Sequence, residues 1–160
     1  MPDLWCKSGI EAGHGTHDYL IDLSNGDSKA ITPEGIAGVE LSPNGMSAAV
    51  QGPDGNWGTW LLEGDGIRTI PGLGSNHRVI GWSPDGGSVY AVSSRAAVKR
   101  HEVYQVNAAT GKMQLWRNFG EDAGAGVSAF AAPHLSSDGT AYAYIYTRTL
   151  SEAYVVTGLK

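Results

Sequence analysis

The sequence is poor in cysteine, in charged residues and in long apolar runs. Cys6 is the only cysteine among 160 residues, which excludes an intramolecular disulfide and a thiolate metal cluster within one chain. No apolar run approaches the ~20 residues that a membrane-spanning helix needs. Charged residues make up only 17% and the formal net charge is −5, so we expect neither nucleic acid nor a membrane as a partner.

The N-terminal residues 1–13 also lack the basic start and the apolar centre of a secretory signal. We therefore expect the chain as written to be cytoplasmic, or extracytoplasmic if it is part of a longer parent. We also expect no cofactor.

Glycine and aromatic residues are plentiful, with 23 Gly, five Trp and seven Tyr, which favours strands separated by many turns. Three segments share one pattern: VELSPNGMSAAV (39–50), IGWSPDGGSVYAV (80–92) and HLSSDGTAYAYIY (134–146). In each, a short apolar strand precedes a serine, a tight turn and an alternating strand. Asn-Gly and Asp-Gly supply the positive φ that such a turn needs. The recurrence predicts three equivalent hairpins.

A second pattern follows each hairpin: an aromatic-containing strand, a glycine turn and another strand. It occurs as WGTWLLEGDGIRTI, HEVYQVNAATGKMQLW and SEAYVVTGLK, and once more as HDYLIDLSNGDSKAIT at 17–32. Counting along the chain places Tyr19, Trp60, Tyr104 and Tyr154 at the same position of this strand.

Together the patterns define a repeating unit of four antiparallel strands, here called a, b, c and d. The first unit has b at 4–8, c at 19–23 and d at 29–32, and the fourth has a at 132–136, b at 141–147 and c at 153–157. The second and third units are complete. The predicted unit boundaries are 1–35, 36–73, 74–121 and 122–160. Repeated four-stranded units predict an all-β fold, a β-propeller of about four blade units with three, four, four and three strands, and a partial propeller.

The stretch WSPDGGSVYAVSS…YQVNAATGKMQLW resembles the WD40-like repeat of TolB-type bacterial propellers, and all four units match it. The end YAYIYTRTLSEAYVVTGLK is similar to the ends of propellers attached to bacterial serine/threonine kinases or transcriptional regulators. The resemblance implies sensing or scaffolding, and it supplies no catalytic residue. Complete members have more blades, so it also implies a C-terminal fragment of a larger propeller.

The segment GHGTHDYL at 13–20 resembles the catalytic-histidine stretch of subtilisin-like proteases. Such a triad needs an upstream Asp-Ser/Thr-Gly and a downstream Gly-Thr-Ser-Met-Ala segment, and the sequence has neither. A metal site is a weak alternative, with His14, His17 and Asp18 as candidates, but their spacing matches no usual zinc pattern. We expect a polar loop without a bound metal.

The b–c and d–a loops of a propeller emerge on one face, here called the loop face. Its two longest loops are predicted at 93–102 and 118–130, and extra loop length is where repeat proteins usually bind. We expect no catalytic residue. The candidate ligand-binding residues are His14, His17, His77, Arg95, Lys99, Arg100, Glu121 and Asp122.

The function predicted from these features is a non-catalytic binding or scaffold module that recognises a protein or a small ligand through the loop face. The alternative is a hydrolase or the propeller lid of a peptidase, with a metal near His14 and His17.

The incomplete first and last units predict exposed flanks that carry Leu4, Trp5, Tyr142, Tyr144 and Tyr146. We expect a homodimer that closes an eight-blade ring and covers both flanks. A four-blade monomer and a stub of a longer parent are the alternatives.

Overall fold

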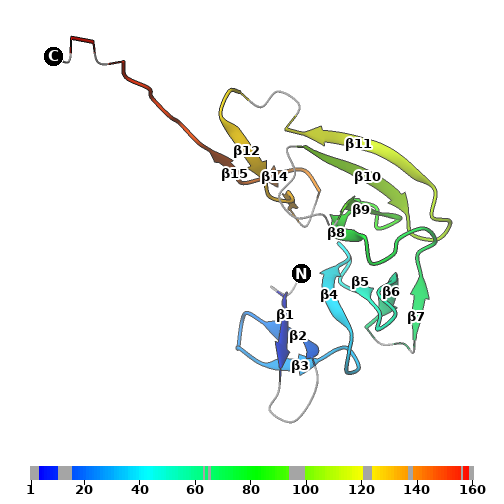
Figure 1. Ribbon diagram of the computed structural model, residues 1–160. Coiled ribbons are helices and arrows are strands. Elements are labelled where there is room, and N and C mark those ends of the chain that lie inside the picture. Colours follow the sequence, from blue (N-terminus) through cyan, green and yellow to red (C-terminus); the bar gives the residue numbers. More distant parts are fainter. Residues whose placement is uncertain are drawn as a thin grey trace.

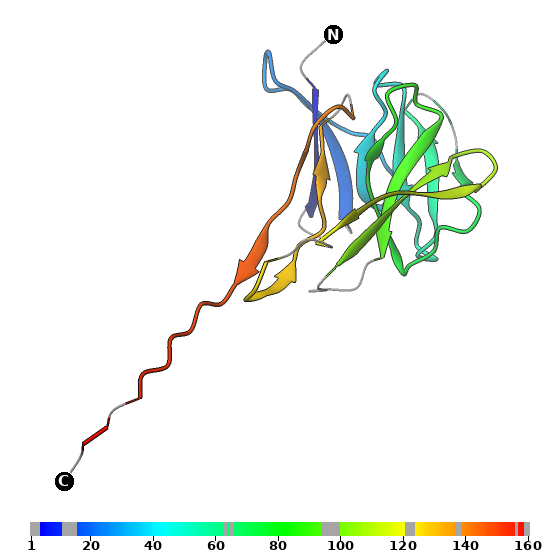
Figure 2. The same cartoon turned by 90° about the horizontal axis from the view of Figure 1, so that it is seen from above.

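The computed structural model describes residues 4–10, 16–62, 64, 66–93, 100–120, 124–136, 139–155 and 157–158. These residues form antiparallel sheets joined by turns and contain no helix, which confirms the predicted all-β, partial-propeller fold. Figures 1 and 2 show the sheets following one another along the chain, with the C-terminal segment leading away from them. No helix capable of crossing a membrane occurs in this described part.

The first three units are consecutive meanders, as their strand patterns predict. The first sheet has three strands: β1 (Leu4–Ile10), β2 (Thr16–Asp22) and β3 (Ser28–Ala30). The second has four: β4 (Ala37–Leu41), β5 (Ser47–Gln51), β6 (Trp57–Leu61) and β7 (Ile67–Thr69). The third also has four: β8 (His77–Trp82), β9 (Ser88–Ser93), β10 (His101–Asn107) and β11 (Met113–Phe119).

The fourth unit is a single a–b hairpin interrupted in its middle. Its strands are β12 (Val127–Phe130), β13 (His134–Leu135), β14 (Tyr142–Ala143) and β15 (Tyr146–Arg148), and β12 pairs with β15 while β13 pairs with β14. The register shifts by one residue between the pairs Leu135–Tyr142 and Phe130–Tyr146. Pro133 is fully buried between the two short ladders and has no N–H to donate, so the ladder breaks there.

The predicted strand c of the fourth unit is wrong, because β12 to β15 supply only strands a and b of this unit. The described residues 151–155 and 157–158 form no strand, and Tyr154 is 82% exposed. Figure 2 shows this segment continuing straight on from β15 instead of turning back. The segment pairs with no strand of the described chain, and the edge of β14 and β15 beside which strand c would lie stays unpaired there.

The three a–b turns have the same geometry, as predicted. The turn glycine donates its backbone N–H to the backbone carbonyl of the serine in each turn. The distances are 2.8, 2.8 and 2.9 Å for Ser42, Ser83 and Ser136. Each serine Oγ also donates to a backbone carbonyl at the start of strand b, at 2.8, 3.0 and 3.1 Å. The turn glycines Gly45, Gly86 and Gly139 have φ of 67°, 70° and 67°. Serine therefore recurs because its hydroxyl closes the turn that the positive φ begins.

The aromatic residues of strand c do not all coincide, which corrects the predicted alignment. Ala48 and Val89 are equivalent because each pairs with the residue before the turn serine. Trp60 pairs with Ala48, whereas Val89 pairs with Val106. Trp60 therefore corresponds to Val106, which lies two residues after Tyr104 in β10. Counting along the chain missed this shift because the b–c loops differ in length.

Tryptophans connect neighbouring sheets. The largest core cluster packs Trp57, Ile70 and Leu73 of the second unit against Val79 and Trp82 of the third. The Trp57 indole N–H donates to the backbone carbonyl of His77 at 2.9 Å, and that of Trp82 donates to the carbonyl of Glu40 at 2.8 Å. Each indole thus buries a large apolar surface and satisfies a polar group across a unit boundary.

The hydroxyl of the turn residue Ser83 also lowers the pKa of a nearby carboxyl group, which gives a testable prediction. The Ser83 hydroxyl donates to Asp85 at 2.5 Å and the Gly87 N–H donates to the same oxygen at 3.0 Å. Both bonds favour the ionised form and lower the pKa of Asp85 from its usual 3.8. We expect Ser83→Ala to raise the Asp85 pKa toward 3.8 in an NMR pH titration. The pKa of Asp54 is lowered by Asn56 instead and should not move. An unchanged Asp85 pKa would contradict the assignment.

Candidate functional site

The strand register of the third unit defines the loop face. His77 pairs with Ser93 and His101 pairs with Phe119, which places the starts of β8 and β10 and the ends of β9 and β11 at the same edge. The b–c and d–a loops therefore leave this sheet on one side, as the sequence predicts for a propeller.

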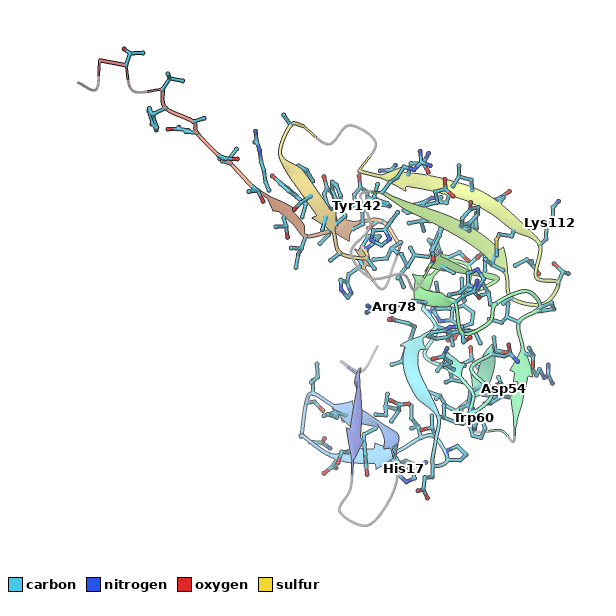
Figure 3. The ribbon with its side chains drawn as sticks, in the orientation of Figure 1. His17, Asp54, Trp60, Arg78, Lys112 and Tyr142 are labelled. Carbon is cyan, nitrogen blue, oxygen red and sulfur yellow. The ribbon has the colours of Figure 1, made fainter. Side chains whose placement is uncertain are left out.

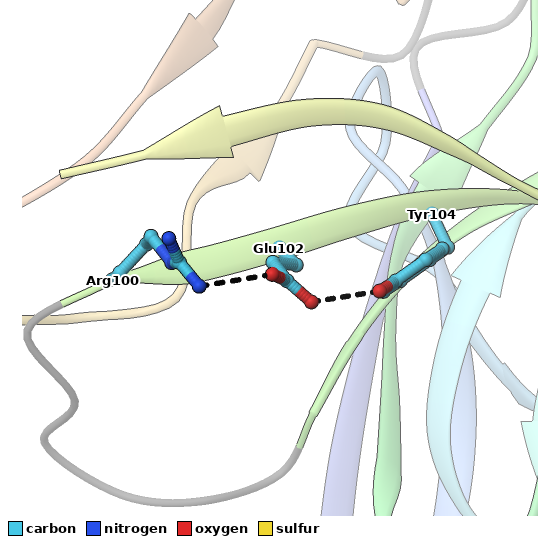
Figure 4. Close-up of polar contacts among 3 residues, drawn as sticks. All are labelled: Arg100, Glu102 and Tyr104. Carbon is cyan, nitrogen blue, oxygen red and sulfur yellow. Dashed lines mark hydrogen bonds and ion pairs between the residues drawn. The ribbon is translucent and has the colours of Figure 1, made fainter. Parts of the chain in front are cut away.

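Arg100 lies on the loop face and is held by a chain of polar contacts (Figure 4). Its guanidinium is 3.2 Å from Glu102 Oε1, and the Tyr104 hydroxyl donates to Glu102 Oε2 at 2.7 Å. The hydrogen bond to this carboxylate raises the pKa of Tyr104. Because Glu102 already neutralises Arg100, an anionic ligand would have to compete with this ion pair.

The predicted residues His17 and Asp18 lie in β2 of the first sheet. His17 Nδ1 is 3.0 Å from the carbonyl of Thr32, and the backbone N–H of Asp18 donates to Thr32 Oγ1 at 3.0 Å. Asp18 is fully buried. These contacts tie β2 to the chain that follows β3, which is a structural role. Figure 3 shows His17 in the first sheet and Tyr142 in the fourth unit.

The other predicted histidines and charges divide into two groups. His77 is half-buried at the start of β8, and its carbonyl accepts the Trp57 indole bond. The residues His14, Arg95, Lys99, Glu121 and Asp122 lie outside the described residues. Within the described part, no group of three histidine, cysteine, aspartate or glutamate side chains could hold a metal ion.

The structure shows a further site beside the end of β11, here called the aromatic groove. It is a cavity of about 430 Å³ between the end of β11 and the hairpin of the fourth unit. Its lining consists mainly of aromatic and arginine side chains: Arg117, Phe119, Phe130, Tyr142, Tyr144, Tyr146 and Arg148, with Asn118, Gly120, Gly124 and Val127.

A row of three tyrosines forms one wall of the aromatic groove. Tyr142, Tyr144 and Tyr146 alternate along strand b, so their rings lie on the same face, and successive centroids are 6.4 Å apart. Phe119 meets the row edge-on, 5.0 Å from Tyr142 and 5.7 Å from Tyr144, and Phe130 packs 5.8 Å from Tyr144. The tyrosines remain about half exposed, as expected for a flank of the fourth unit.

Two arginines flank this row. The Arg117 guanidinium lies 4.9 Å from the centre of the Tyr142 ring and donates to the Tyr142 hydroxyl at 2.6 Å. Arg148 donates from Nε to the carbonyl of Ala125 at 3.1 Å. Among the described residues neither arginine pairs with a carboxylate. The groove thus combines flat apolar surfaces with two guanidinium groups that retain donors for an anion.

The sequence predicts only the tyrosine side of this groove. Alternation in YAYIY predicts that the three tyrosines share one face, and the incomplete fourth unit predicts that this face is an exposed flank. Arg117 and Phe119 come from a different unit, and no local pattern shows that they meet the tyrosines.

No family model and no curated protein matches the chain. Its fold is similar to TolB from Acinetobacter baumannii, with a TM-score of 0.62 and 23% identity over 92% of this chain and 36% of that one. It is also similar to an oligogalacturonate lyase from Vibrio parahaemolyticus, with a TM-score of 0.55 and 12% identity over 91% of this chain and 43% of that one. The chain thus spans less than half the length of either structure. Identities this low show the fold alone: the chain has the fold of part of a β-propeller.

Proposed function

We propose that the chain is a non-catalytic binding module that takes a small anionic, ring-bearing ligand into the aromatic groove. The observation that carries this proposal is the row of exposed tyrosine rings flanked by two arginines that no carboxylate neutralises among the described residues. Tyrosine rings offer flat surfaces for stacking, and arginine presents paired donors that match a carboxylate. The groove lining includes Gly120 and Gly124 of the predicted d–a loop, which agrees with the loop-face binding expected from the sequence.

A suitable probe is trigalacturonate, whose sugar rings each carry a carboxylate. The name of the oligogalacturonate lyase suggests this compound as a probe, and the choice does not rest on any likeness of site. We expect saturable binding by calorimetry that weakens as salt is added, because exposed charges are screened. Arg117→Gln and Tyr144→Ala should each weaken it about tenfold, which corresponds to ~1.4 kcal/mol.

Two controls accompany this test. The neutral trisaccharide maltotriose has the same number of rings without carboxylates and should bind much more weakly. Lys112→Ala removes an exposed cation at the turn between β10 and β11, away from the loop face, and should leave the affinity unchanged. Equal affinity for both sugars, or no saturable binding of either, would contradict the proposal.

The alternative predicted from the sequence, a hydrolase or the propeller lid of a peptidase with a metal near His14 and His17, remains a prediction. Metal analysis of the purified protein together with a broad hydrolase screen tests it directly.

A further inference from the structure

The C-terminal segment after β15, residues 149–158, is here called the tail. It is extended and exposed in its described part, with Tyr154 82% and Val155 89% exposed. In the views of both Figure 1 and Figure 2 it continues the line of β15 away from the sheets. The Thr149 N–H donates to the Gly126 carbonyl at 2.8 Å, and the described residues beyond it lie in no ladder. An extended segment with apolar residues is a ready template for strand pairing.

The tail has the sequence of a strand c. Its Glu152-Ala153-Tyr154 matches Glu102-Val103-Tyr104 at the start of β10 in the third unit. The similarity extends to a contact, because the Tyr154 hydroxyl donates to Glu152 just as the Tyr104 hydroxyl donates to Glu102. Both pairs place a glutamate and a tyrosine on one face of an extended chain.

The place where strand c would pair is open. β14 and β15 each have one strand neighbour among the described residues, whereas β9, the equivalent strand b of the third unit, lies between β8 and β10. In that unit Tyr104 pairs with Ala91, and Val103 pairs with Val92. Transferred to the fourth unit, this register sets Tyr154 opposite Tyr144.

We infer that two copies of this chain exchange their tails, each tail serving as strand c of the partner's fourth unit. Since strand b and the tail lie on one line, two copies in antiparallel orientation bring each tail beside the other copy's strand b. The register that pairs 154 with 144 then places Thr149 of both copies at the two-fold axis. Such an exchange of identical elements is a recognised route to dimers.

This exchange goes beyond the proposed ligand binding and differs from the eight-blade ring predicted from the sequence. The ring would pack the first unit of one copy on the fourth unit of the other, with 153–157 as strand c of its own chain. The exchange joins the two fourth units and adds Tyr154 to the tyrosine row. Mass measurements test the exchange, whereas the calorimetric titration tests the groove, so either can fail alone.

The first experiment measures mass by light scattering over a dilution series. We expect the full chain to reach about twice the 16.8 kDa of one chain, and Glu152→Pro to remain at one chain. The Thr149 N–H donates to Gly126 of its own strand a, so in the extended tail the N–H of residue 152 faces the partner's strand b, and proline there removes a ladder hydrogen bond. Ala153→Pro is the matched control, since the N–H of residue 153 faces away from that strand, and it should dimerise as well as the parent. A monomer at every concentration, or a dimer that Glu152→Pro does not affect, would overturn the exchange.

The second experiment locates the axis by cross-linking. In a Cys6→Ser background, Thr149→Cys should form a disulfide between two chains under mild oxidation, because opposed residues of antiparallel strands lie roughly 4.5–5.5 Å apart. Lys112→Cys, equally exposed but far from the tail in the fold, should cross-link much more slowly. The pair Ala143→Cys with Val155→Cys should likewise link two chains. A disulfide within one chain would show the tail folding back on its own hairpin and would overturn the exchange.

Discussion

Trp82→Ala should be the most destabilising single substitution among those considered. The Trp82 side chain is 4% exposed, packs in the largest core cluster and bonds to the Glu40 carbonyl across a unit boundary. Truncating a buried tryptophan typically costs about 3–5 kcal/mol, a large share of the ~5–15 kcal/mol that stabilises a domain. The loss also leaves the partly buried Glu40 carbonyl without this donor. We expect the variant to melt at least roughly 10 °C lower by calorimetry.

Trp82→Phe separates the two contributions. It keeps a six-membered ring in the core but removes the indole N–H and part of the bicyclic ring, so it should cost less than Trp82→Ala and more than the ~1 kcal/mol of a single hydrogen bond. A melting temperature for Trp82→Ala close to that of the parent would show that the second and third sheets do not depend on this contact.

Gly111→Ala should be the second most damaging change. Gly111 closes the turn between β10 and β11 with φ of 70°, and its N–H donates to the Asn107 carbonyl at 2.8 Å. A Cβ there would lie 2.3 Å from the Pro71 carbonyl oxygen and 2.7 Å from the Pro71 Cβ. Because Pro71 follows β7 of the second unit, the turn would have to move away from its neighbouring unit. We expect a loss of more than about 3 kcal/mol by urea denaturation.

Gly86→Ala is a matched control for this clash. Gly86 has the same φ of 70°, but no atom lies within 4 Å of a Cβ built there. Its cost should therefore be only the ~1–2 kcal/mol of the left-handed conformation. Equal losses at both positions would mean that backbone conformation, and not contact with Pro71, decides the effect.

The sequence predicted those parts of the fold that local chemistry determines. Ser42, Ser83 and Ser136 were found because the same hydroxyl, the same glycine and the same φ recur in each turn. Trp60 corresponds to Val106 and not to Tyr104, two residues away, because the b–c loops differ in length and no local pattern specifies loop length. The strand predicted at 153–157 failed for a different reason: its sequence suits a strand, but whether a strand forms depends also on packing against neighbouring surfaces, which local sequence does not specify.

The candidate site divides in the same way. The tyrosines of the aromatic groove are visible in the sequence as an alternating row. Their meeting with Arg117 and Phe119 depends on how the fourth unit packs on the third, and no spacing within either unit specifies that packing. The charged residues predicted for the loop face rest only on the extra length of their loops and on their charge. Of these, the structure describes Arg100 and shows it already paired with Glu102.

The connectivity of the sheets has a consequence for folding rate. Every ladder in the first three units joins strands that are consecutive in the chain, and the β12–β15 pair encloses only the short β13–β14 ladder. Most native pairing therefore closes short loops, and the entropy lost before each contact forms is small. Proteins with such local contacts fold faster than β-sandwiches of similar size, whose strands pair across long separations. Contacts such as Trp82 to Glu40 span two units and should form late, once the hairpins on either side exist.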